Sequence, residues 1–482
     1  MKKEYDIIII GAGVVGCSIA RELSKYQVDT LLIEKECDVA MGTSGSNSGV
    51  AHAGFYVKPG TLKAELNIKG HRVMPKLCQE LDVPYQEVGK LVVAKNEDET
   101  EYLYKLKEVG EVNGTKELNV IDRERIKELE PNIEGVNALH SPTSAILDPF
   151  LLTIGLAENA VRNEVRILLD TEVLGIEVND FFTVKTGRGK FRTEYVVNSA
   201  GLFSDRIARM VGITRYRIYP CRGEYHILDK NRRNLINGMI YPVPPKDLGG
   251  LGVHLTPTTD ENILIGPSAE YIEEVNVANT VGVMDNLFRE AEELLPKVSR
   301  KDIIRSFAGI RTKLIQEGST EPKDFVIEDA MVNNFINLIG IESPGLTAAP
   351  AIAEKVVELI KKGRELDINQ GFKPERKSPV RFNKLTPQEK TELIKRNPNY
   401  GEIVCRCETV TKQEVIDALN NPLGAGSIYS VRRRTKATCG RCQGGFCIPK
   451  IVEVINEVSH PSIEDLTLKG KGSELFIGRT RE

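Results

Sequence analysis

A glycine-rich turn near the start of the chain has the spacing of a phosphate-binding loop. Gly11, Gly13 and Gly16 follow an apolar run that we predict to be a strand, and a helical pattern and a second apolar strand come next. The second strand ends in Glu34. The glycines let the backbone approach a pyrophosphate, the start of the helix offers free N–H groups, and the acid accepts hydrogen bonds from a ribose. This arrangement predicts a dinucleotide-binding unit.

A second group of reactive residues lies near the other end of the chain. Cys405 and Cys407 form a Cys-x-Cys pair, and Cys439 and Cys442 form a Cys-x-x-Cys pair about thirty residues later. Four thiolates in two such pairs suit an iron–sulfur cluster or a zinc ion. The ligand type alone does not separate these two kinds of site.

Two further features accompany these cysteines. Cys447 is the remaining thiol of this region, and we interpret it as buried or idle. The basic run at residues 432–436 has the charge to offset a thiolate cluster or to bind an acidic partner, but we interpret it as a solvated face. The concentration of cysteines in the last fifth of the chain marks a separate module, in which an intracellular setting favours a metal over disulfides.

The composition is that of an ordinary globular protein and argues against several classes. The net charge is −3 over 482 residues, and no long block of like charge is present, so we expect no nucleic-acid partner. No apolar run approaches the ~20 residues that span a bilayer. The first residues lead directly into a predicted core strand, which argues against a signal peptide. We therefore predict a cytoplasmic protein without a transmembrane segment, and leave peripheral membrane association open.

The elements that must position these groups alternate between helices and strands, which indicates an α/β fold. Residues 42–54 form a loop of small and hydroxyl-bearing residues that can wrap an extended ligand. Residues 61–81 and 149–162 are predicted helices. A β-rich meander at residues 171–197 returns the chain to the first sheet, and residues 217–267 are again strand-like.

These motifs resemble the glycine oxidase and D-amino-acid oxidase superfamily of FAD-dependent oxidoreductases over residues 1 to about 365. Within it, the stretches at residues 47–54, 222–225, 241–244 and 252–254 are similar to L-2-hydroxyglutarate dehydrogenase. The whole layout, with its cysteine-rich tail, is similar to the FAD subunit of anaerobic glycerol-3-phosphate dehydrogenase. The tail resembles the bacterioferritin-associated ferredoxin-like module, which implies a 2Fe–2S cluster held by the two cysteine pairs, with zinc as the alternative.

The resemblance implies a Rossmann-like FAD-binding domain with an interleaved β-rich substrate domain and a small α-rich C-terminal domain with four cysteines. The FAD-binding domain is expected at residues 1–80, 145–215 and 330–365, the substrate-binding domain at 81–144 and 216–329, a linker at 366–400, and the iron–sulfur domain and tail at 401–482. The implied FAD contacts are Gly11, Gly13, Val15, Gly16, Glu34, Lys35, Thr43, Ser44, Ser46, Asn47, Ser48, Gly49, Val173, Ala200, Gly201, Gly340, Ser343, Gly345, Leu346 and Thr347.

Oxidation of an alcohol by a bound flavin requires a base for the hydroxyl proton. The chain has six His, of which His52 and His254 lie in the loop and the strand expected beside the flavin and the substrate, so both are candidate bases. Arg311 follows a small-residue segment where relatives keep an arginine that pairs with a carboxylate or phosphate. Arg222 and Tyr241 are secondary candidates for binding the anion or the hydroxyl.

Four functions agree with this interpretation. The tail favours oxidation of sn-glycerol 3-phosphate to dihydroxyacetone phosphate, with electrons passing through the cluster to a protein partner in a hetero-oligomer. The motifs of the substrate half favour L-2-hydroxyglutarate or another 2-hydroxy acid. In both cases the substrate is a small anionic hydroxy compound. The third function is that of an imino-acid or opine dehydrogenase subunit, and the fourth is that of a non-catalytic electron-transfer subunit that retains FAD.

Overall fold

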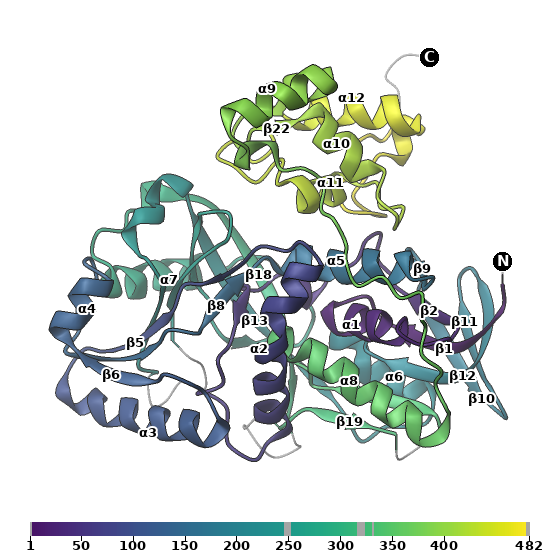
Figure 1. Cartoon of the computed structure of the whole chain (residues 1–482), viewed down its shortest axis with the longest axis horizontal. Helices are drawn as coiled ribbons and strands as arrows, with labels where there is room; N and C mark the ends of the chain where they lie inside the picture. Colours follow the sequence, from purple (N-terminus) through teal and green to yellow (C-terminus); the bar gives the residue numbers. More distant parts are fainter. Residues whose placement is uncertain (1, 245–251, 316–322, 330–331, 479–482) are drawn as a thin grey trace.

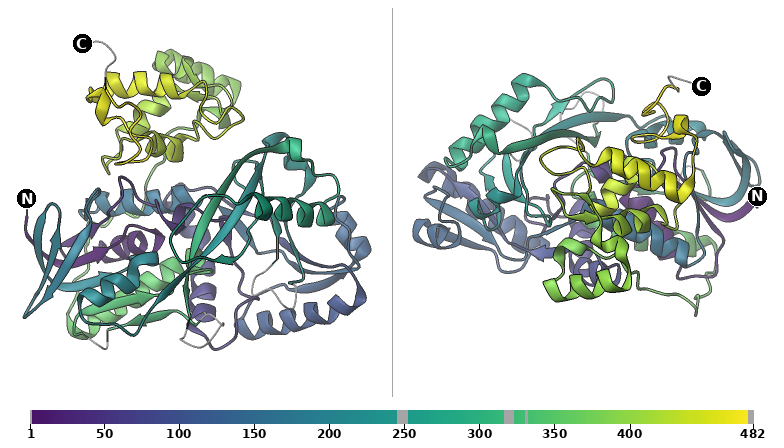
Figure 2. Two further views of the ribbon diagram at one scale, coloured as in Figure 1. Left: turned by 180° about the vertical axis from the view of Figure 1, so that it is seen from behind. Right: turned by 90° about the horizontal axis from the view of Figure 1, so that it is seen from above.

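The computed structural model describes residues 2–244, 252–315, 323–329 and 332–478. Two large sheets and their helices form a body, and a small C-terminal domain lies on this body as a separate lobe (Figure 1 and the left view of Figure 2). Among the residues described, no helix is long and apolar enough to cross a membrane.

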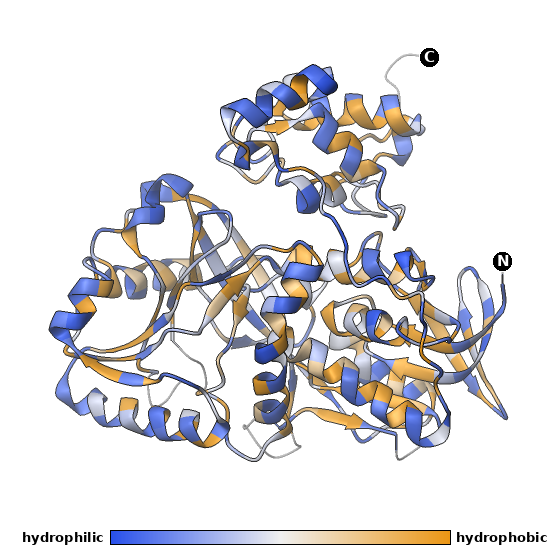
Figure 3. Cartoon of the chain, viewed as in Figure 1, coloured by the Kyte–Doolittle hydropathy of each residue, from blue (hydrophilic) through white to orange (hydrophobic). Residues whose placement is uncertain are grey.

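The first sheet has eight strands and contains the glycine-rich turn at one strand end. Its order is β10-β11-β12-β1-β2-β9, with β20 beside β12 and β19 beside β20. The strand bounds are β1 Glu4–Ile10, β2 Thr30–Ile33, β9 Arg166–Leu168, β10 Val173–Val178, β11 Phe182–Thr186, β12 Gly189–Asn198, β19 Val326–Glu328 and β20 Phe335–Ile339. The central pairs β12–β1 and β1–β2 are parallel. Because both faces of a parallel sheet are covered, its strands are continuous apolar runs, as the orange strands of Figure 3 show.

Three helices pack with this sheet in one apolar core: α1 (Val14–Leu23), α5 (Pro149–Arg162) and α8 (Gly345–Gly363). The predicted meander is confirmed, since β10, β11 and β12 are antiparallel neighbours that lead to β1. The strand β19 also belongs to this sheet, although the domain assignment from the sequence placed its residues with the substrate half.

The second sheet has nine strands that come from two separate parts of the chain. Its order is β17-β13-β16-β15-β14-β5-β7-β6, with β18 paired to β13. The bounds are β5 Lys90–Ala94, β6 Asn119–Asp122, β7 Asn137–Ser141, β13 Ile218–Leu228, β14 Met239–Pro242, β15 His254–Pro257, β16 Ile263–Gly266, β17 Glu270–Tyr271 and β18 Ile303–Leu314. The helices α3 (Glu97–Asn113), α4 (Arg123–Leu129) and α7 (Val281–Leu294) accompany it. A small third sheet joins β3 (Val50–Ala51), β8 (Ala145–Leu147) and β4 (Tyr85–Glu87).

Several predicted helix starts are confirmed by their caps. α2 (Leu62–Glu80) begins after Thr61, whose side chain accepts a hydrogen bond from the N–H of Ala64. Asp148 caps α5 in the same way, and Pro149 occupies the first helical position, where its missing N–H costs nothing. Such caps are encoded within one turn of the chain, which explains why the sequence predicts them.

Residues 366–400, predicted as a linker, are packed against both parts of the molecule. Arg376 forms two hydrogen bonds with Glu158 of α5, at 2.9 and 2.7 Å, and all of these donor and acceptor atoms are buried. The segment also contains α9 (Pro387–Arg396), and the ring of Phe382 stacks against Tyr400 beside the C-terminal domain. The connection is therefore attached to the body along part of its length.

The C-terminal domain is a small helical unit with its own core. It contains β21 (Ile403–Cys405), β22 (Val410–Thr411), α10 (Lys412–Leu419), α11 (Ile428–Thr435) and α12 (Ile448–Ser459). Val415, Val431 and Ile451 are fully buried between these helices. α10 starts with a capping box, a motif readable from the sequence Thr411-x-x-Glu414: the side chain of each residue accepts a hydrogen bond from the backbone N–H of the other.

The basic run on α11 joins this domain to the body. Arg434 pairs with Asp38 at 2.6 and 3.2 Å, and the two side chains are 1% and 0% exposed. Arg433 donates to the carbonyl of Val39 at 3.0 Å, and Lys436 pairs with Asp260 at 2.9 Å. The prediction of a solvated face is therefore wrong, because the body supplies the buried carboxylates that compensate these charges.

Candidate active site

A cavity of about 2440 Å³ runs from the glycine-rich turn of the first sheet to residues of the second sheet. Of the predicted FAD contacts, sixteen line it: Gly11, Gly13, Val15, Glu34, Lys35, Thr43, Ser44, Ser46, Asn47, Ser48, Val173, Ala200, Gly201, Ser343, Gly345 and Leu346. Gly16, Gly49, Gly340 and Thr347 lie outside this lining.

The glycine-rich end of the cavity fits the nucleotide half of a dinucleotide. Gly11 has a φ of +100°, and a Cβ at this position would lie 2.7 Å from the carbonyl oxygen of Ser199. A Cβ at Gly16 would lie 2.0 Å from the carbonyl oxygen of Gly11, which explains its position outside the cavity. The carboxylate of Glu34 accepts from the N–H of Ala12 at 2.7 Å, and burial raises its pKa. These residues form the turn, the helix start and the acid that a bound adenosine and pyrophosphate require.

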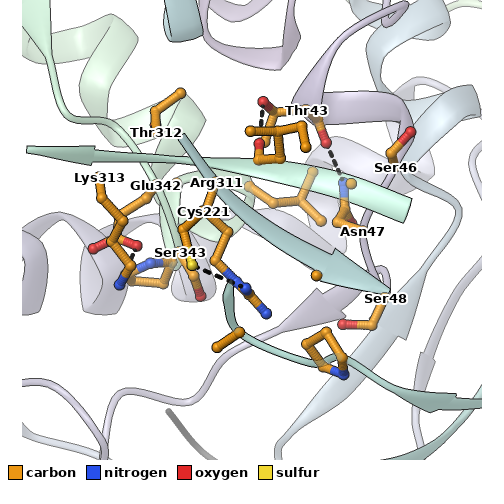
Figure 4. A pocket seen from close by; sticks show the side chains of 18 of the residues that line it. Thr43, Ser46, Asn47, Ser48, Cys221, Arg311, Thr312, Lys313, Glu342 and Ser343 are labelled. Carbon is orange, nitrogen blue, oxygen red and sulfur yellow. Dashed lines mark hydrogen bonds and ion pairs between the residues drawn. The ribbon is translucent and has the colours of Figure 1, made fainter. Parts of the chain in front are cut away.

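The hydroxyl-rich loop is fixed to the strand β18. Thr43 donates from its hydroxyl to the carbonyl of Ile310 at 2.7 Å, and the amide of Asn47 donates to the carbonyl of Ser44 at 2.9 Å. A Cβ at Gly309 would lie 1.9 Å from the carbonyl oxygen of Ser46, so only glycine permits this contact. The loop thereby holds the hydroxyls of Ser46 and Ser48 at the cavity wall (Figure 4).

The other side of the cavity is closed by the segment that starts α8. Ser343, Gly345 and Leu346 line the cavity, and the hydroxyl of Thr347 accepts from the backbone N–H of His52 at 3.0 Å. Thr347 therefore positions the loop that carries His52 rather than facing the cavity. The start of a 19-residue helix also points free N–H groups toward this region.

Both candidate bases lie in the cavity wall and are uncharged at neutral pH. Burial lowers the pKa of His52 well below its ordinary value, and the neighbouring charges of Lys90 and His71 act in the same direction. The pKa of His254 also lies well below its ordinary value. Burial is the main cause, and the charges of Lys90, Arg311 and His52 lower it further. The His52 Nε2 atom lies 3.4 Å from the Ser343 hydroxyl. Neutral imidazoles can accept a proton, as a base must.

Arg311 extends from β18 into the cavity, beside Ser48 (Figure 4). Its two terminal nitrogens both donate to the carbonyl of Ser268, at 3.1 Å each, and it forms no ion pair within the part of the chain that the structure describes. A Cβ at Gly223 would lie 2.9 Å from a guanidinium nitrogen, so glycine makes room for it. Lys313, which also lines the cavity, is instead paired with Glu342 at 2.7 Å.

Arg222 lies on the other face of its strand and outside the cavity lining. It donates to Glu270 at 2.6 Å and to Thr280 at 2.8 Å. Successive strand residues point to opposite faces, so its neighbours Cys221 and Gly223 line the cavity while Arg222 does not. The structure therefore does not bring Arg222 together with Arg311 and the histidines.

Tyr241 lines the cavity, and its ring stacks on His254 at 3.8 Å between centroids. Beside this ring lies Lys90, which the sequence analysis missed. Lys90 is 1% exposed, and its ammonium lies 4.1 Å from the Tyr241 ring centroid and within 5.5 Å of the rings of Tyr56 and Phe55. Burial lowers the pKa of Lys90 to about 7. The one sequence signal was a lysine at the start of an otherwise apolar strand.

The predicted metal ligands of the C-terminal domain lie close to the contact with the body. Cys407 is exposed, Cys405 is buried, and the remaining two predicted ligands are partly buried. Glu408, next to Cys407, pairs with Lys230 of the body, and Arg441 pairs with Asp229. The cysteine region and the body are thus joined by ion pairs beside the second sheet.

Comparison with known proteins assigns both parts of the chain to known families. Residues 6–359 match the family described as FAD dependent oxidoreductase, and residues 403–457 match the BFD-like [2Fe-2S] binding domain. The chain is 42% identical over 483 residues to glycerol 3-phosphate dehydrogenase of Caloramator mitchellensis, which covers 99% of each chain. It is 30% identical over 416 residues to human mitochondrial L-2-hydroxyglutarate dehydrogenase, covering 75% of this chain and 90% of the human protein.

A solved structure agrees with these relatives. FAD-bound, dithionite-reduced L-alpha-glycerophosphate oxidase from Mycoplasma pneumoniae superimposes with a TM-score of 0.72 at 31% identity, covering 78% of this chain and all of the oxidase. The fold class and the superfamily resemblance predicted from the sequence are confirmed. The chain belongs to the FAD-dependent oxidoreductase family and carries a C-terminal BFD-like [2Fe-2S] binding domain.

Proposed function

We propose that this protein is an FAD-dependent dehydrogenase that oxidises sn-glycerol 3-phosphate to dihydroxyacetone phosphate. The observation that carries the proposal is a cavity shared by neutral imidazoles and the guanidinium of Arg311, which pairs with no carboxylate among the described residues. The 42% identity to a glycerol 3-phosphate dehydrogenase over the whole chain supports the choice of substrate. FAD, when bound, supplies the acceptor for the hydride.

The chain's own residues would bind the anion and take the proton. Arg311 uses two donors on one carbonyl, which leaves further N–H groups for a phosphate oxygen. His52 would accept the proton of the alcohol, because its environment keeps the imidazole neutral. His254 would lie beside the substrate as the second candidate base, and its stacking on the ring of Tyr241 would hold it in position. The secondary role first considered for Arg222 would be limited to holding β17 against β13, through Glu270.

We further propose that the C-terminal domain holds a 2Fe–2S cluster and passes electrons to a protein partner. The match of residues 403–457 to a BFD-like [2Fe-2S] binding domain supports the cluster over zinc. The exposure of Cys407 supports transfer at the protein surface. Iron and acid-labile sulfide in anaerobically purified protein, with a visible and EPR spectrum, test this directly; stoichiometric zinc without iron would reject it.

The second candidate is oxidation of L-2-hydroxyglutarate. The 30% identity to L-2-hydroxyglutarate dehydrogenase over most of the catalytic part supports it. Lys90 supplies a further cation at the cavity wall, beyond Arg311, which suits a substrate with two carboxylates. The two candidates differ in the number of anionic groups that the site must bind.

Anaerobic stopped-flow bleaching of the flavin separates these candidates. The purified chain is mixed with glycerol 3-phosphate, L-2-hydroxyglutarate, L-lactate or L-proline, and the rate constant of reduction is measured. We expect glycerol 3-phosphate to reduce the flavin at least tenfold faster than the remaining three compounds. Faster reduction by L-2-hydroxyglutarate selects the second candidate, reduction by proline alone selects an imino-acid dehydrogenase, and no reduction by any substrate rejects the catalytic proposal.

A further inference from the structure

Three polar atoms in the cavity wall have no hydrogen-bond partner among the described residues. They are Nζ of Lys90, the hydroxyl oxygen of Tyr56 and Nδ1 of His254. Other buried polar atoms in the described part of the chain also lack partners, but only these three belong to residues that line the cavity. A buried polar atom without a partner costs about 1–3 kcal/mol, and native proteins contain few of them. Their presence in one cavity indicates that a bound molecule supplies the missing partners.

The strand order brings two of these groups to the same face of the second sheet. Tyr241 of β14 lies opposite Val92 of β5, which is two residues from Lys90. On the other side of β14, the register of β14 and β15 sets His254 beside Tyr241, and the two rings stack. Because alternate residues of a strand share a face, Lys90, Tyr241 and His254 all point to one face of the sheet.

Tyr56 reaches the same place from the loop between β3 and α2. The ammonium of Lys90 lies 5.4 Å from the centroid of the Tyr56 ring, and the rings of Tyr56 and Tyr241 are 6.1 Å apart between centroids. The ammonium and the Tyr56 hydroxyl are not hydrogen-bonded to each other. The two groups therefore border the same small space, and neither satisfies the other.

This space and Arg311 lie on opposite sides of His254 in the sheet. From β15, which carries His254, the order runs through β14 to β5 in one direction, and through β16 and β13 to β18 in the other. The charges of Lys90 and Arg311 both lower the pKa of His254, and the charge of Lys90 also lowers that of His52. Both cations are therefore near the candidate bases. A substrate whose reacting carbon lies beside these imidazoles can extend one polar end to Arg311 and the other toward Lys90.

We infer that Lys90 and Tyr56 form a subsite that binds a second oxygen-bearing group of the substrate, at the end away from the anion held by Arg311. The ammonium donates hydrogen bonds, and the phenol hydroxyl can donate or accept. In glycerol 3-phosphate this group is the terminal hydroxyl, and in L-2-hydroxyglutarate it is the distal carboxylate. The subsite rests on the proposed function, and it makes the protein selective for hydroxy anions that carry this further group.

Truncated substrates test the subsite by anaerobic stopped-flow reduction of the flavin. Glycerol 3-phosphate is compared with the matching enantiomer of 2-hydroxypropyl phosphate, in which a methyl group replaces the terminal hydroxymethyl group. The preference is the ratio of the two substrates' reduction rate constants, each divided by its half-saturating concentration. A site that hydrogen-bonds a hydroxyl rejects an analogue without it, so the native protein is expected to prefer glycerol 3-phosphate by about 100-fold. Tyr56→Phe and Lys90→Met should each lower this preference by about tenfold.

Tyr85→Phe is the matched control. The hydroxyl of Tyr85 is also buried without a partner among the described residues, but Tyr85 is not part of the cavity lining, so this variant should keep the native preference. Far-UV circular dichroism and FAD content establish that the variants are folded; if Lys90→Met is not, Tyr56→Phe, which removes a single oxygen, decides.

The outcomes separate the subsite from the proposed function. If Tyr56→Phe slows reduction by both compounds equally, the preference is unchanged and the subsite is overturned while the oxidation of glycerol 3-phosphate stands. If L-2-hydroxyglutarate is the faster substrate, the same comparison is made with L-2-hydroxybutyrate, which lacks the distal carboxylate. No reduction by glycerol 3-phosphate or L-2-hydroxyglutarate rejects the proposed function, and the subsite with it.

Discussion

Replacement of Lys90 by methionine is expected to make the protein more stable and less active. Lys90 is 1% exposed, and within the described part of the chain its ammonium has no hydrogen-bond partner. A buried charge without a partner is costly, and methionine has a similar length and no charge. A lysine kept in such a place indicates a role in the cavity rather than a contribution to folding.

The magnitude follows from the pKa of Lys90. Burial lowers it from 10.5 to about 7, and one pKa unit corresponds to about 1.4 kcal/mol, so the charged form costs about 5 kcal/mol in the folded state. Cation–π contacts with the surrounding rings offset about 2 kcal/mol of this cost. We therefore expect Lys90→Met to raise the free energy of unfolding by about 2 kcal/mol at pH 7, after a smaller loss of packing.

The pH dependence has a defined sign. Between pH 7 and pH 10.5 the unfolded chain binds a proton at Lys90 that the folded chain has released, so this residue makes the native protein more stable as the pH rises through that range. The advantage of Lys90→Met should therefore shrink toward pH 10.5. The free energies of unfolding of Lys90→Met and of the native protein are subtracted at each pH. The contributions of the other titrating groups are the same in both proteins and therefore cancel from this difference.

The assay is urea denaturation followed by far-UV circular dichroism and by release of the flavin, since the chain contains no Trp for fluorescence. Lys95→Met is the matched control: Lys95 follows the same strand, its side chain is 41% exposed, and its pair with Glu293 is expected to contribute less than about 1 kcal/mol. In stopped-flow reduction, Lys90→Met should move the acidic limb of the rate profile to higher pH, because Lys90 lowers the pKa of both His52 and His254. A variant that is less stable than the native protein at pH 7 would refute the reasoning.

Further outcomes are expected at His52, Gly223 and Arg434. His52→Ala should slow flavin reduction by about 10²- to 10⁴-fold with FAD retained. The reduction rate of the native protein should show no acidic limb above pH 6.5, because the pKa of His52 lies well below that value; an acidic limb centred above 6.5 would contradict this. Gly223→Ala should weaken substrate binding without loss of FAD, since its Cβ would lie 2.9 Å from the Arg311 guanidinium, and unchanged half-saturation in substrate titrations would count against Arg311 as the anion site. Arg434→Met should destabilise the chain by about 3–5 kcal/mol in denaturation, because Asp38 is left buried without its partner, while the double variant with Asp38→Leu should recover much of the loss.

Local patterns were enough to predict many elements of this protein. The glycine turn after β1 and the caps at Thr61, Asp148 and Thr411 are encoded within a few residues of each other, because each depends on backbone geometry over a single turn. The family resemblance added the FAD cavity, of which most expected contacts line the wall. Sequence spacing therefore identified the class of chemistry.

A second set of features depended on which groups meet in space. Arg222 and Arg311 are both arginines in strands. Which of them enters the cavity depends on which face of β13 or β18 each occupies, and only Arg311 lies on the cavity face. The basic run on α11 is buried only because Asp38 lies opposite to it, almost four hundred residues earlier in the chain. The approach of the Cys407 and Cys442 sulfurs to 3.8 Å likewise depends on the fold of the C-terminal domain.

The sequence by itself determined the nucleotide-binding unit, the superfamily and the presence of a cysteine-rich module, since each is a short-range pattern of residue types. Only the tertiary structure placed Lys90 within a cage of aromatic rings, Arg311 without a carboxylate partner among the described residues, and Arg434 against Asp38. The physical reason is that burial and charge compensation are properties of neighbours in space, and in this chain those neighbours come from distant segments.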